Sequence, residues 1–474
     1  MEQGAKTQYL NLTEGSVAKG LIRFALPFVI SSFLQACLNL ADILILERFV
    51  GAVATSAAGV GGQVTFLLTN AVIGFATGGT ILIARFFGAG DQNSLKKTLN
   101  TMFALFVILA VGFTVIFLIA NPFILRAMQT PDEAFGDAKA YLNITTTGLI
   151  FIFLYNGISG ALRGMGDSKS PLYFIAFACV VNVGLDIVAV KYLNMGPAGA
   201  AWATVISQAL SVVLSLIYLL KKKGLFNVKE IRFKIDKVIL KEVLHLGIPT
   251  ALQNSLITLS FMFLTSIVNV IGANDGERMA LHTSSANVLS TKYNGFAILP
   301  ARAVASAISS MVSQNIGAKK TKRTRDTFVV GLIISVSIGT VILIVTQLFT
   351  KELFSFFSND PDTMRYGIVL MQAMAWDYAL MPIAASMFGY LDGWGRTTVT
   401  SIVNTVSAVA IRVPLGYLLG ITFGMGMAGV GYALPISSLV SGLIVYTYAL
   451  IKRKEFDVNN PKNILVGSPV NFDA

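Results

Sequence analysis

Twelve apolar segments, each close to the roughly 20 residues that cross the hydrocarbon core of a bilayer, constrain this chain more than any other feature. Inside lipid every backbone N–H and C=O must be hydrogen-bonded within the protein, which favours α-helices. Only 13% of the 474 residues are charged, about half the share of an average soluble domain. We therefore predict an all-α integral membrane protein. The predicted transmembrane helices are 20–45, 54–80, 98–120, 141–162, 170–190, 198–220, 246–271, 285–312, 327–349, 366–391, 398–420 and 428–451.

The distribution of Lys and Arg predicts the orientation of these helices. With the N-terminus in the cytoplasm, cytoplasmic segments hold 26 basic residues and external loops hold seven. This bias follows the positive-inside rule, so we expect a multi-pass protein of the cell (inner or cytoplasmic) membrane with both termini cytoplasmic. The net charge of +12 is then explained by topology and by anionic lipid headgroups, and not by binding of nucleic acid.

Short motifs recur once along the chain. Residues 83–92 (IARFFGAGDQ) match 312–321 (VSQNIGAKKT), and residues 162–168 (LRGMGDS) match 391–397 (LDGWGRT), both 229 residues later. Six helices per repeat give both repeats the same orientation, which predicts two pseudo-symmetric six-helix lobes with a cavity between them. The predicted domains are an N-lobe at 1–220, a cytoplasmic amphipathic connector at 221–245, a C-lobe at 246–455 and a cytoplasmic tail at 456–474.

Asp42 is the most informative residue of the first predicted helix. Gln35, Asn39 and Asp42 are spaced i, i+4 and i+7, so they share one stripe of a helix whose other residues are apolar. A carboxylate at membrane depth is costly unless it is paired, hydrated or protonated, and such residues are usually functional. The alternative is an aspartate that reaches the nearby interface or is satisfied by a neighbouring helix.

In order and spacing, four motifs resemble those of the multidrug and toxic compound extrusion (MATE) transporters. They are Pro27-x14-Asp42, Ala84-Arg85-x-x-Gly88-Ala89-Gly90, Ala161 to Pro171 (ALRGMGDSKSP), and Asn182-x-x-x-Asp186 followed by Gly196-x-x-Gly199 and Thr204. The resemblance covers residues 15–455. It implies two six-helix lobes and a secondary active antiporter that exports small organic compounds, cationic or amphipathic, by alternating access. Export would be driven by inward flow of H+ or Na+, with no other cofactor.

The fifth predicted helix carries a second membrane-depth carboxylate. Asn182 and Asp186 are spaced i, i+4 and share a face. Two carboxylates close together cannot both ionise cheaply, so one should bind and release a proton near neutral pH, although the same oxygens would suit Na+. By resemblance, the coupling site comprises Asp42, Asn182, Asp186 and Thr204. Weaker candidates to surround it are Gln35, Asn39, Tyr141, Tyr155 and Asn156. Ordinary hydrogen bonds between helices remain the alternative for Asn182 and Thr204.

The second half differs in charge. Its membrane-depth charged residues are Lys292, Arg302, Asp377 and Arg412, and its seventh helix offers only the amides Gln253 and Asn254. One interpretation is that Asp377 neutralises Arg412 or Lys292 as a buried pair. The other is that basic groups face a cavity and attract an anionic or zwitterionic substrate. That second interpretation supports an alternative function, a flippase or exporter of a lipid-linked or anionic product.

Other functional classes fit the sequence less well. The two histidines, His245 and His282, lie near the ends of predicted helices, without metal-ligand spacing and without a nucleophile elbow, which argues against an enzyme. The sequence has no phosphate-binding loop of the type that hydrolyses ATP. Cys37 and Cys179 lie in apolar segments, suggest neither a disulfide nor a metal site, and are interpreted as apolar filler. No metal is expected beyond a possible Na+ at Asp42, Asn182 and Asp186. The expected partners are a small-molecule substrate and the lipid bilayer, with the protein acting as a monomer.

Overall fold

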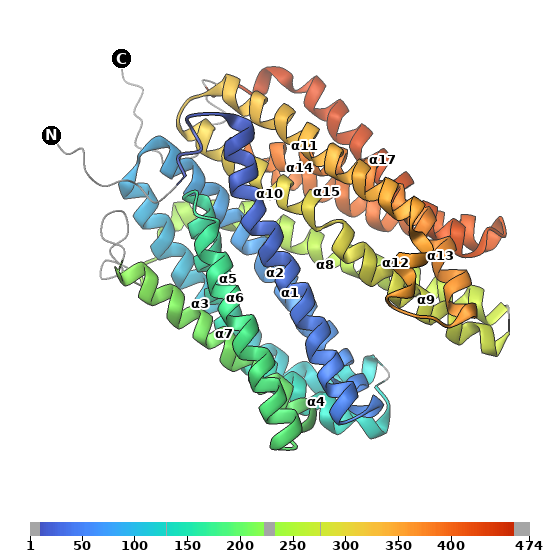
Figure 1. Cartoon of the computed structure of the whole chain (residues 1–474). Helices are drawn as coiled ribbons and strands as arrows, with labels where there is room; N and C mark the ends of the chain where they lie inside the picture. The colour runs from blue at the N-terminus through green and yellow to red at the C-terminus, as the bar shows by residue number, and fades with distance from the viewer. Residues whose placement is uncertain (1–9, 129, 222–232, 275, 459–474) are drawn as a thin grey trace, which may run out of the picture. The chain divides into compact units, whose positions relative to one another are not determined.

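In the computed structural model, which describes residues 10–128, 130–221, 233–274 and 276–458, every regular element is a helix (Figure 1). Eleven helical segments in these ranges are long and apolar enough to span a membrane, and a bent pair of shorter helices makes a twelfth. The predicted all-α membrane fold is therefore confirmed. Most of the helices extend beyond the predicted spans, because hydropathy marks only the part of a helix that lies in lipid.

The first half of the chain, coloured blue to green in Figure 1, contains six spans. Its elements are α1 (Val17–Phe49), α2 (Ala52–Ala89), α3 (Gln92–Ala127), α4 (Asp132–Thr147), α5 (Leu149–Gly164), α6 (Lys169–Asp186), the π-helix η1 (Ile187–Tyr192) and α7 (Gly196–Lys221). Helices α4 and α5 meet at an angle of 45° and form one bent span. Gly148 lies at the bend, where a β-carbon would collide with Val205 of α7.

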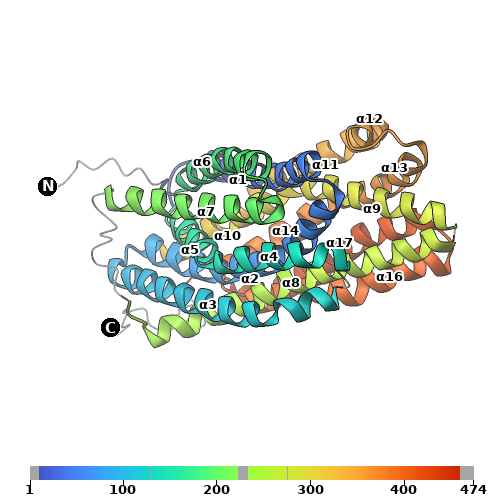
Figure 2. The same cartoon turned by 90° about the horizontal axis from the view of Figure 1, so that it is seen from below.

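The second half repeats this order with additional short elements. They are α8 (Lys237–Asn274), α9 (Glu277–Ala297), α10 (Leu299–Gly317), α11 (Thr321–Leu348), α12 (Thr350–Ser355), α13 (Pro361–Ala375), α14 (Asp377–Gly393), α15 (Thr397–Val406), the π-helix η3 (Ser407–Arg412), α16 (Val413–Tyr417), the π-helix η4 (Leu418–Thr422), α17 (Gly426–Ile451) and the 3₁₀ turn η5 (Arg453–Glu455). The short α12 packs between the end of α11 and the start of α13 (Figure 2).

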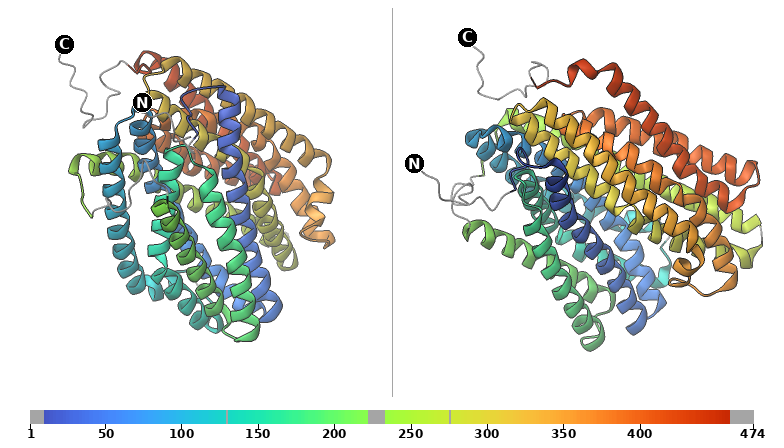
Figure 3. Two further views of the ribbon diagram at one scale, coloured as in Figure 1. Left: turned by 60° about the vertical axis from the view of Figure 1, so that its left-hand side comes forward. Right: turned by 45° about the horizontal axis from the view of Figure 1, so that its top comes forward.

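Helix packing divides the described chain into two units, each with its own core. One comprises residues 26–251 and the other residues 12–25 and 252–458. In the first unit α2 packs against α4 and α5 (Figure 3). The ring of Phe106 in α3 meets that of Phe153 in α5 edge to face, with their centroids 6.0 Å apart. In the second unit α14 packs against α10, α11 and α17.

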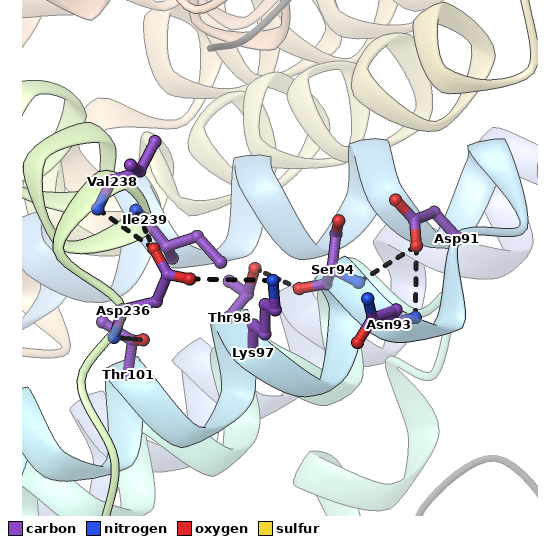
Figure 4. Close-up of polar contacts among 9 residues, drawn as sticks. All are labelled: Asp91, Asn93, Ser94, Lys97, Thr98, Thr101, Asp236, Val238 and Ile239. Carbon is purple, nitrogen blue, oxygen red and sulfur yellow. Dashed lines mark hydrogen bonds and ion pairs between the residues drawn. The ribbon is translucent and has the colours of Figure 1, made fainter. Parts of the chain in front are cut away.

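The start of α8 differs from the sequence-based expectation. Residues 233–245 do not form a separate surface helix, since α8 begins at Lys237, and residues 222–232 of the predicted connector and 459–474 of the predicted tail lie outside the described residues. Asp236 explains the early start: its Oδ1 accepts from the backbone N–H groups of Val238 at 3.0 Å and Ile239 at 3.2 Å. The N–H of Asp236 donates to Thr101 of α3 at 3.0 Å (Figure 4).

Helix packing places the first residues of α1 and of α8 in a different unit from the lobe that the sequence predicted for them. Residues 17–25 of α1 belong to the second unit, where Leu21 lies against Gly331 of α11. Residues 237–251 of α8 belong to the first unit, where Gly247 lies against Phe75 of α2. The predicted bounds, 1–220 and 246–455, divide the chain by hydropathy, which carries no information on which helices touch.

The internal repeat is visible in the backbone as well as in the motifs. Left-handed conformations occur at Gly90 (φ 71°) and Lys319 (φ 57°), and at Gly166 (φ 88°) and Gly395 (φ 79°), each pair separated by 229 residues. The Gly166 and Gly395 turns are those of the matching LRGMGDS and LDGWGRT motifs, where a positive φ favours glycine. The two halves therefore share their turn geometry even where their residues differ.

Candidate functional site in the first unit

The structure brings together the three polar residues Asp42 of α1 and Asn182 and Asp186 of α6. With its nitrogen towards the carboxyl groups, the side-chain amide of Asn182 donates to Asp42 Oδ1 at 3.0 Å and to Asp186 Oδ2 at 3.0 Å. This orientation gives the nitrogen and the oxygen of the amide hydrogen-bond partners. Asn182 and Asp186 are 0% exposed, and Asp42 is half-buried.

The local structure of α6 explains why its two residues face Asp42 together. Asn182 and Asp186 are one helical turn apart, so both side chains leave the same face. Directly after Asp186 the helix widens into the π-helix η1. Single π-helical turns of this kind are rare and often occur at functional sites.

Thr204 of α7 completes the cluster through its backbone. The Asn182 side-chain oxygen accepts from the backbone N–H of Thr204 at 3.1 Å. The Thr204 hydroxyl instead donates to the carbonyl of Ala200, one turn earlier in the same helix, at 3.0 Å. Thr204 therefore fixes the orientation of the Asn182 amide, and its hydroxyl is used within α7.

The two carboxyl groups can hold a proton or a small cation between them. The side chains of Asp42 and Asp186 also interact directly with one another, and a hydrogen bond between two carboxyl groups requires a proton on one of them. Asp186 Oδ1 is buried and has no hydrogen-bond partner within the described ranges. Such an oxygen is a vacant acceptor, and vacant buried acceptors are rare in folded proteins.

The other residues predicted for this region divide into one neighbour and four that point elsewhere. The ring of Tyr141 packs over Gly61 of α2, and a β-carbon built on Gly61 would lie 2.6 Å from Tyr141 Cδ1. Tyr141 also lies close enough to Asp42 and Asp186 to interact electrostatically with both. Two of the remaining four form hydrogen bonds away from the site. Tyr155 donates to Pro171 O at 3.3 Å, and Asn156 donates to Ile152 O at 2.8 Å within α5. The other two, Gln35 and Asn39, have exposed side chains.

Cys179 belongs to this region, although the sequence suggested only an apolar filler. It lies three residues before Asn182 on α6, is buried, and its Sγ donates to Leu34 O of α1 at 3.8 Å. Its thiol also lies close enough to Asp42 to interact electrostatically with it. The available signal was its i, i+3 spacing from Asn182, which places both on neighbouring parts of one face.

In the second unit a different buried cluster lies around Arg412 of η3. Arg412 Nε donates to Ser437 Oγ of α17 at 3.0 Å, and the guanidinium lies 5.3 Å from the ring centroid of Phe261. Asp377 of α14 is 5% exposed, bonds to Ser438 and is close enough to Arg412 to attract it. Asp377 Oδ1 and Arg412 Nη1 have no hydrogen-bond partner in the described chain.

Four other polar residues were predicted in the second half. Arg302 of α10 is exposed and is close enough to Arg412 to repel it. Lys292 of α9 and the amides Gln253 and Asn254 of α8 are half-buried. Arg412, and not Lys292, is therefore the cation whose charge offsets that of Asp377.

The counterparts of the two aspartates in the second repeat are apolar. Leu264 follows Asp42 by 222 residues, and Gly416 follows Asp186 by 230 residues. These two counterparts touch, because a β-carbon on Gly416 would lie 2.6 Å from Leu264 Cδ2. The backbone of both repeats thus brings the same two positions together, and only the first repeat places carboxyl groups there.

Comparison with known proteins agrees with this architecture. The family model MatE matches residues 27–188 and 249–418, once in each repeat. The chain is 29% identical over 440 residues to "Probable multidrug resistance protein YpnP" of Bacillus subtilis, covering 92% of this chain and 96% of that one. It is 23% identical over 447 residues to "FAD transporter" of Shewanella oneidensis, covering 92% and 95%.

Solved structures share the fold. A structure described as the outward-facing conformation of a multidrug resistance MATE family transporter has a TM-score of 0.87 at 21% identity, covering 95% of this chain and 99% of that one. A transporter from Pyrococcus furiosus has the same TM-score, identity and coverage. The family model matches most of the chain, once in each of the two structural repeats. This protein therefore belongs to the MatE family of membrane transporters.

Proposed function

We propose that this protein is a secondary active antiporter that exports small organic compounds, cationic or amphipathic, in exchange for H+ or Na+. The observation that carries the proposal is the buried contact of Asp42, Asn182 and Asp186. The name of the Bacillus subtilis relative, a multidrug resistance protein, supports organic compounds as the substrate class. The excess of Lys and Arg in the segments assigned to the cytoplasm supports a cell-membrane protein with both termini inside.

The proposed coupling follows from the cost of charge in a membrane. With both carboxyl groups ionised, Asp42 and Asp186 repel one another in a buried site, and that state is unfavourable. A proton on one of them, or a Na+ between them, removes most of this cost. A conformation that encloses the site is then accessible to the loaded protein, and a conformation that hydrates the site favours release. Asn182 supplies the donors that hold the remaining negative charge.

Reconstituted vesicles test this proposal. A cationic dye is loaded into vesicles, and a proton gradient and a sodium gradient are imposed separately. We expect efflux under at least one gradient, loss of that efflux in Asp42→Asn, and normal efflux in the control Glu47→Gln. Glu47 is an exposed acid on the same helix, so its variant changes the same charge without touching the site. Full gradient-driven efflux in Asp42→Asn would disprove the proposed site.

A second candidate is an exporter or flippase of an anionic, including a lipid-linked, product. Arg302 is exposed in the second unit and lies near Arg412, and the Shewanella oneidensis relative is named an FAD transporter. The same vesicles, loaded with FAD in place of the dye, distinguish the candidates. If the anionic product is the substrate, FAD leaves the vesicles and Arg302→Gln slows its efflux, whereas the dye is retained. Efflux of the dye alone, unaffected by Arg302→Gln, favours the first candidate.

A further inference from the structure

A cavity of about 700 Å³ lies within the second unit, beside the first turns of α11 and the ends of α14 and α17. Its walls are mainly aromatic and apolar, and its charged lining residues are all basic. The aromatic lining residues are Phe328, Tyr390, Tyr446 and Phe456, and the basic ones are Arg325, Arg453 and Lys454. A volume of this size is typical of pockets that bind small molecules.

The aromatic residues form a continuous packed surface. The ring centroid of Phe328 lies 5.2 Å from that of Tyr390 and 6.1 Å from that of Tyr446. Phe456 packs against Tyr390 at 5.8 Å and against Trp394 at 5.6 Å. Tyr390, Trp394 and Phe456 are buried, which holds this surface in place. Rigid aromatic surfaces of this kind suit a hydrocarbon ligand.

The turn that carries Arg453 and Lys454 is held by ion pairs of Glu455, which lies next to Lys454 in the chain. These ion pairs leave the charges of the basic lining residues without an acidic partner in the described ranges. Glu455 in η5 accepts from Lys452 at 2.8 Å and from Arg396 at 3.2 Å, and this pairing raises the pKa of Lys452. The side chains of Arg453 and Lys454, like that of Arg325 in α11, make no hydrogen bond or ion pair with any residue that the structure describes. The buried Phe456 anchors the other end of this turn.

The nearby acidic residues do not offset these three charges directly. Glu455 is engaged by Lys452 and Arg396, and Asp457 accepts from the Thr321 hydroxyl at 3.3 Å. Asp326 interacts electrostatically with Arg323. A site with three basic groups above an apolar wall therefore remains, and its charge is complementary to a ligand with an anionic head and a hydrocarbon chain.

We infer that this cavity binds an anionic phospholipid of the cytoplasmic leaflet. The phosphate lies between Arg325, Arg453 and Lys454, and an acyl chain follows the aromatic wall between α11 and α17. Basic pockets between transmembrane helices on the cytoplasmic side commonly bind anionic headgroups, and arginine matches phosphate oxygens with two parallel N–H groups. Val329 and Leu450, which are 50% and 69% exposed, extend the apolar wall towards the membrane.

Native mass spectrometry of the detergent-purified protein tests this inference, with phosphatidylglycerol and phosphatidylcholine as probes. We expect the wild-type protein to retain phosphatidylglycerol at least tenfold more often than phosphatidylcholine. The triple variant Arg325→Gln, Arg453→Gln, Lys454→Gln should lose this preference. The matched control is Lys169→Gln, Lys237→Gln, Lys241→Gln, which removes three exposed basic charges from the first unit and should keep it.

A second variant tests the apolar wall and covers the case in which the triple variant fails to fold. Ala449 lines the cavity, and Ala449→Trp should fill it and reduce retention of phosphatidylglycerol while leaving all basic residues in place. Equal retention of the two lipids by the wild-type protein, or unchanged retention in Ala449→Trp, would overturn the inference. Displacement of the lipid by millimolar inorganic phosphate alone would also overturn it, because the site would then recognise a free anion.

Discussion

Arg412 occupies in the second repeat the position that Asn182 occupies in the first, 230 residues earlier. Asn182 donates to two carboxyl groups that can take up a cation, whereas Arg412 brings a permanent cation close to Asp377. The two repeats thus differ in how a buried carboxyl group can be neutralised. In the first repeat, we propose that an ion from solution offsets the buried negative charge. In the second, the side chain of Arg412 supplies the positive charge near Asp377.

Removing Arg412 should therefore destabilise the protein. Arg412→Gln leaves the buried Asp377 without its compensating charge, and breaking a buried pair of this kind costs about 3 kcal/mol or more. Thermal unfolding in detergent measures the effect. The double variant Arg412→Gln, Asp377→Asn should recover much of the loss, because no unpaired charge remains. Equal destabilisation of the single and double variants would show that Arg412 acts through packing alone.

Removing the Asn182 amide should change the pH dependence of transport. In Asn182→Ala the carboxyl pair loses two hydrogen bonds that stabilise its negative charge, so it should release its proton only at higher pH. The pH at which efflux is half-maximal should then rise, which vesicle assays at a series of pH values can measure. Asn156→Ala is the control, since Asn156 donates only within its own helix. An unchanged profile in Asn182→Ala would contradict the assigned contact.

An acid-sensitive contact is expected between α9 and the start of α13. Asp360 accepts from the backbone N–H of Thr363 at 2.8 Å and lies 2.9 Å from His282 Nδ1, and these contacts, led by that of the Thr363 N–H, lower the pKa of Asp360. A lowered pKa in the folded state contributes stability above the unfolded value, about 4, and this contribution is lost as the pH falls below it.

The variant Asp360→Ala measures that contribution. Its thermal midpoint should lie below that of the wild-type protein at pH 7, and the difference should shrink as the pH is lowered towards 3. Asp132→Ala, which removes an acid from the first turn of α4, is the comparison. A difference between Asp360→Ala and the wild-type protein that is the same at pH 7 and pH 3 would show that the charge of Asp360 does not matter.

Replacing Lys319 by glycine should stabilise the protein. Lys319 has φ 57° where the first repeat has Gly90 at φ 71°. A side chain in this conformation costs about 1 kcal/mol relative to glycine. Lys319→Gly should therefore raise the thermal midpoint, and Gly90→Ala should lower it. A lower midpoint in Lys319→Gly would mean that contacts of the lysine side chain outweigh the backbone strain.

Much of this architecture was predictable from the sequence because the bilayer limits the choices. Apolar length fixed the number of spans, and the spacing of Asn182 and Asp186 fixed their common face. That Asp42 meets them followed only from the family resemblance, since the periodicity of one helix does not say which neighbour its polar stripe faces. For the same reason Tyr155 and Asn156, which bond elsewhere, could not be separated in advance from Tyr141.

Other features depend on local contacts that hydropathy does not report. The charged residues before 246 suggested a surface helix, yet the Asp236 cap lets α8 begin at Lys237. Thr204 was predicted as a residue of the site, and it contacts Asn182 through its backbone N–H while its hydroxyl donates to the carbonyl of Ala200. Side-chain bonds to the previous turn are common for threonine in helices, so a hydroxyl inferred as a ligand needs structural evidence.

The left-handed backbone conformation of Lys319 bears on how the protein is inserted into the membrane. It is one of five basic residues between 319 and 325, a cluster that the charge bias assigns to the cytoplasm. Glycine would relieve the turn, but it would also remove a basic charge that, under the positive-inside rule, favours retention of this loop in the cytoplasm. At this position the charge bias that would set membrane topology and the stability of the folded turn favour different residues.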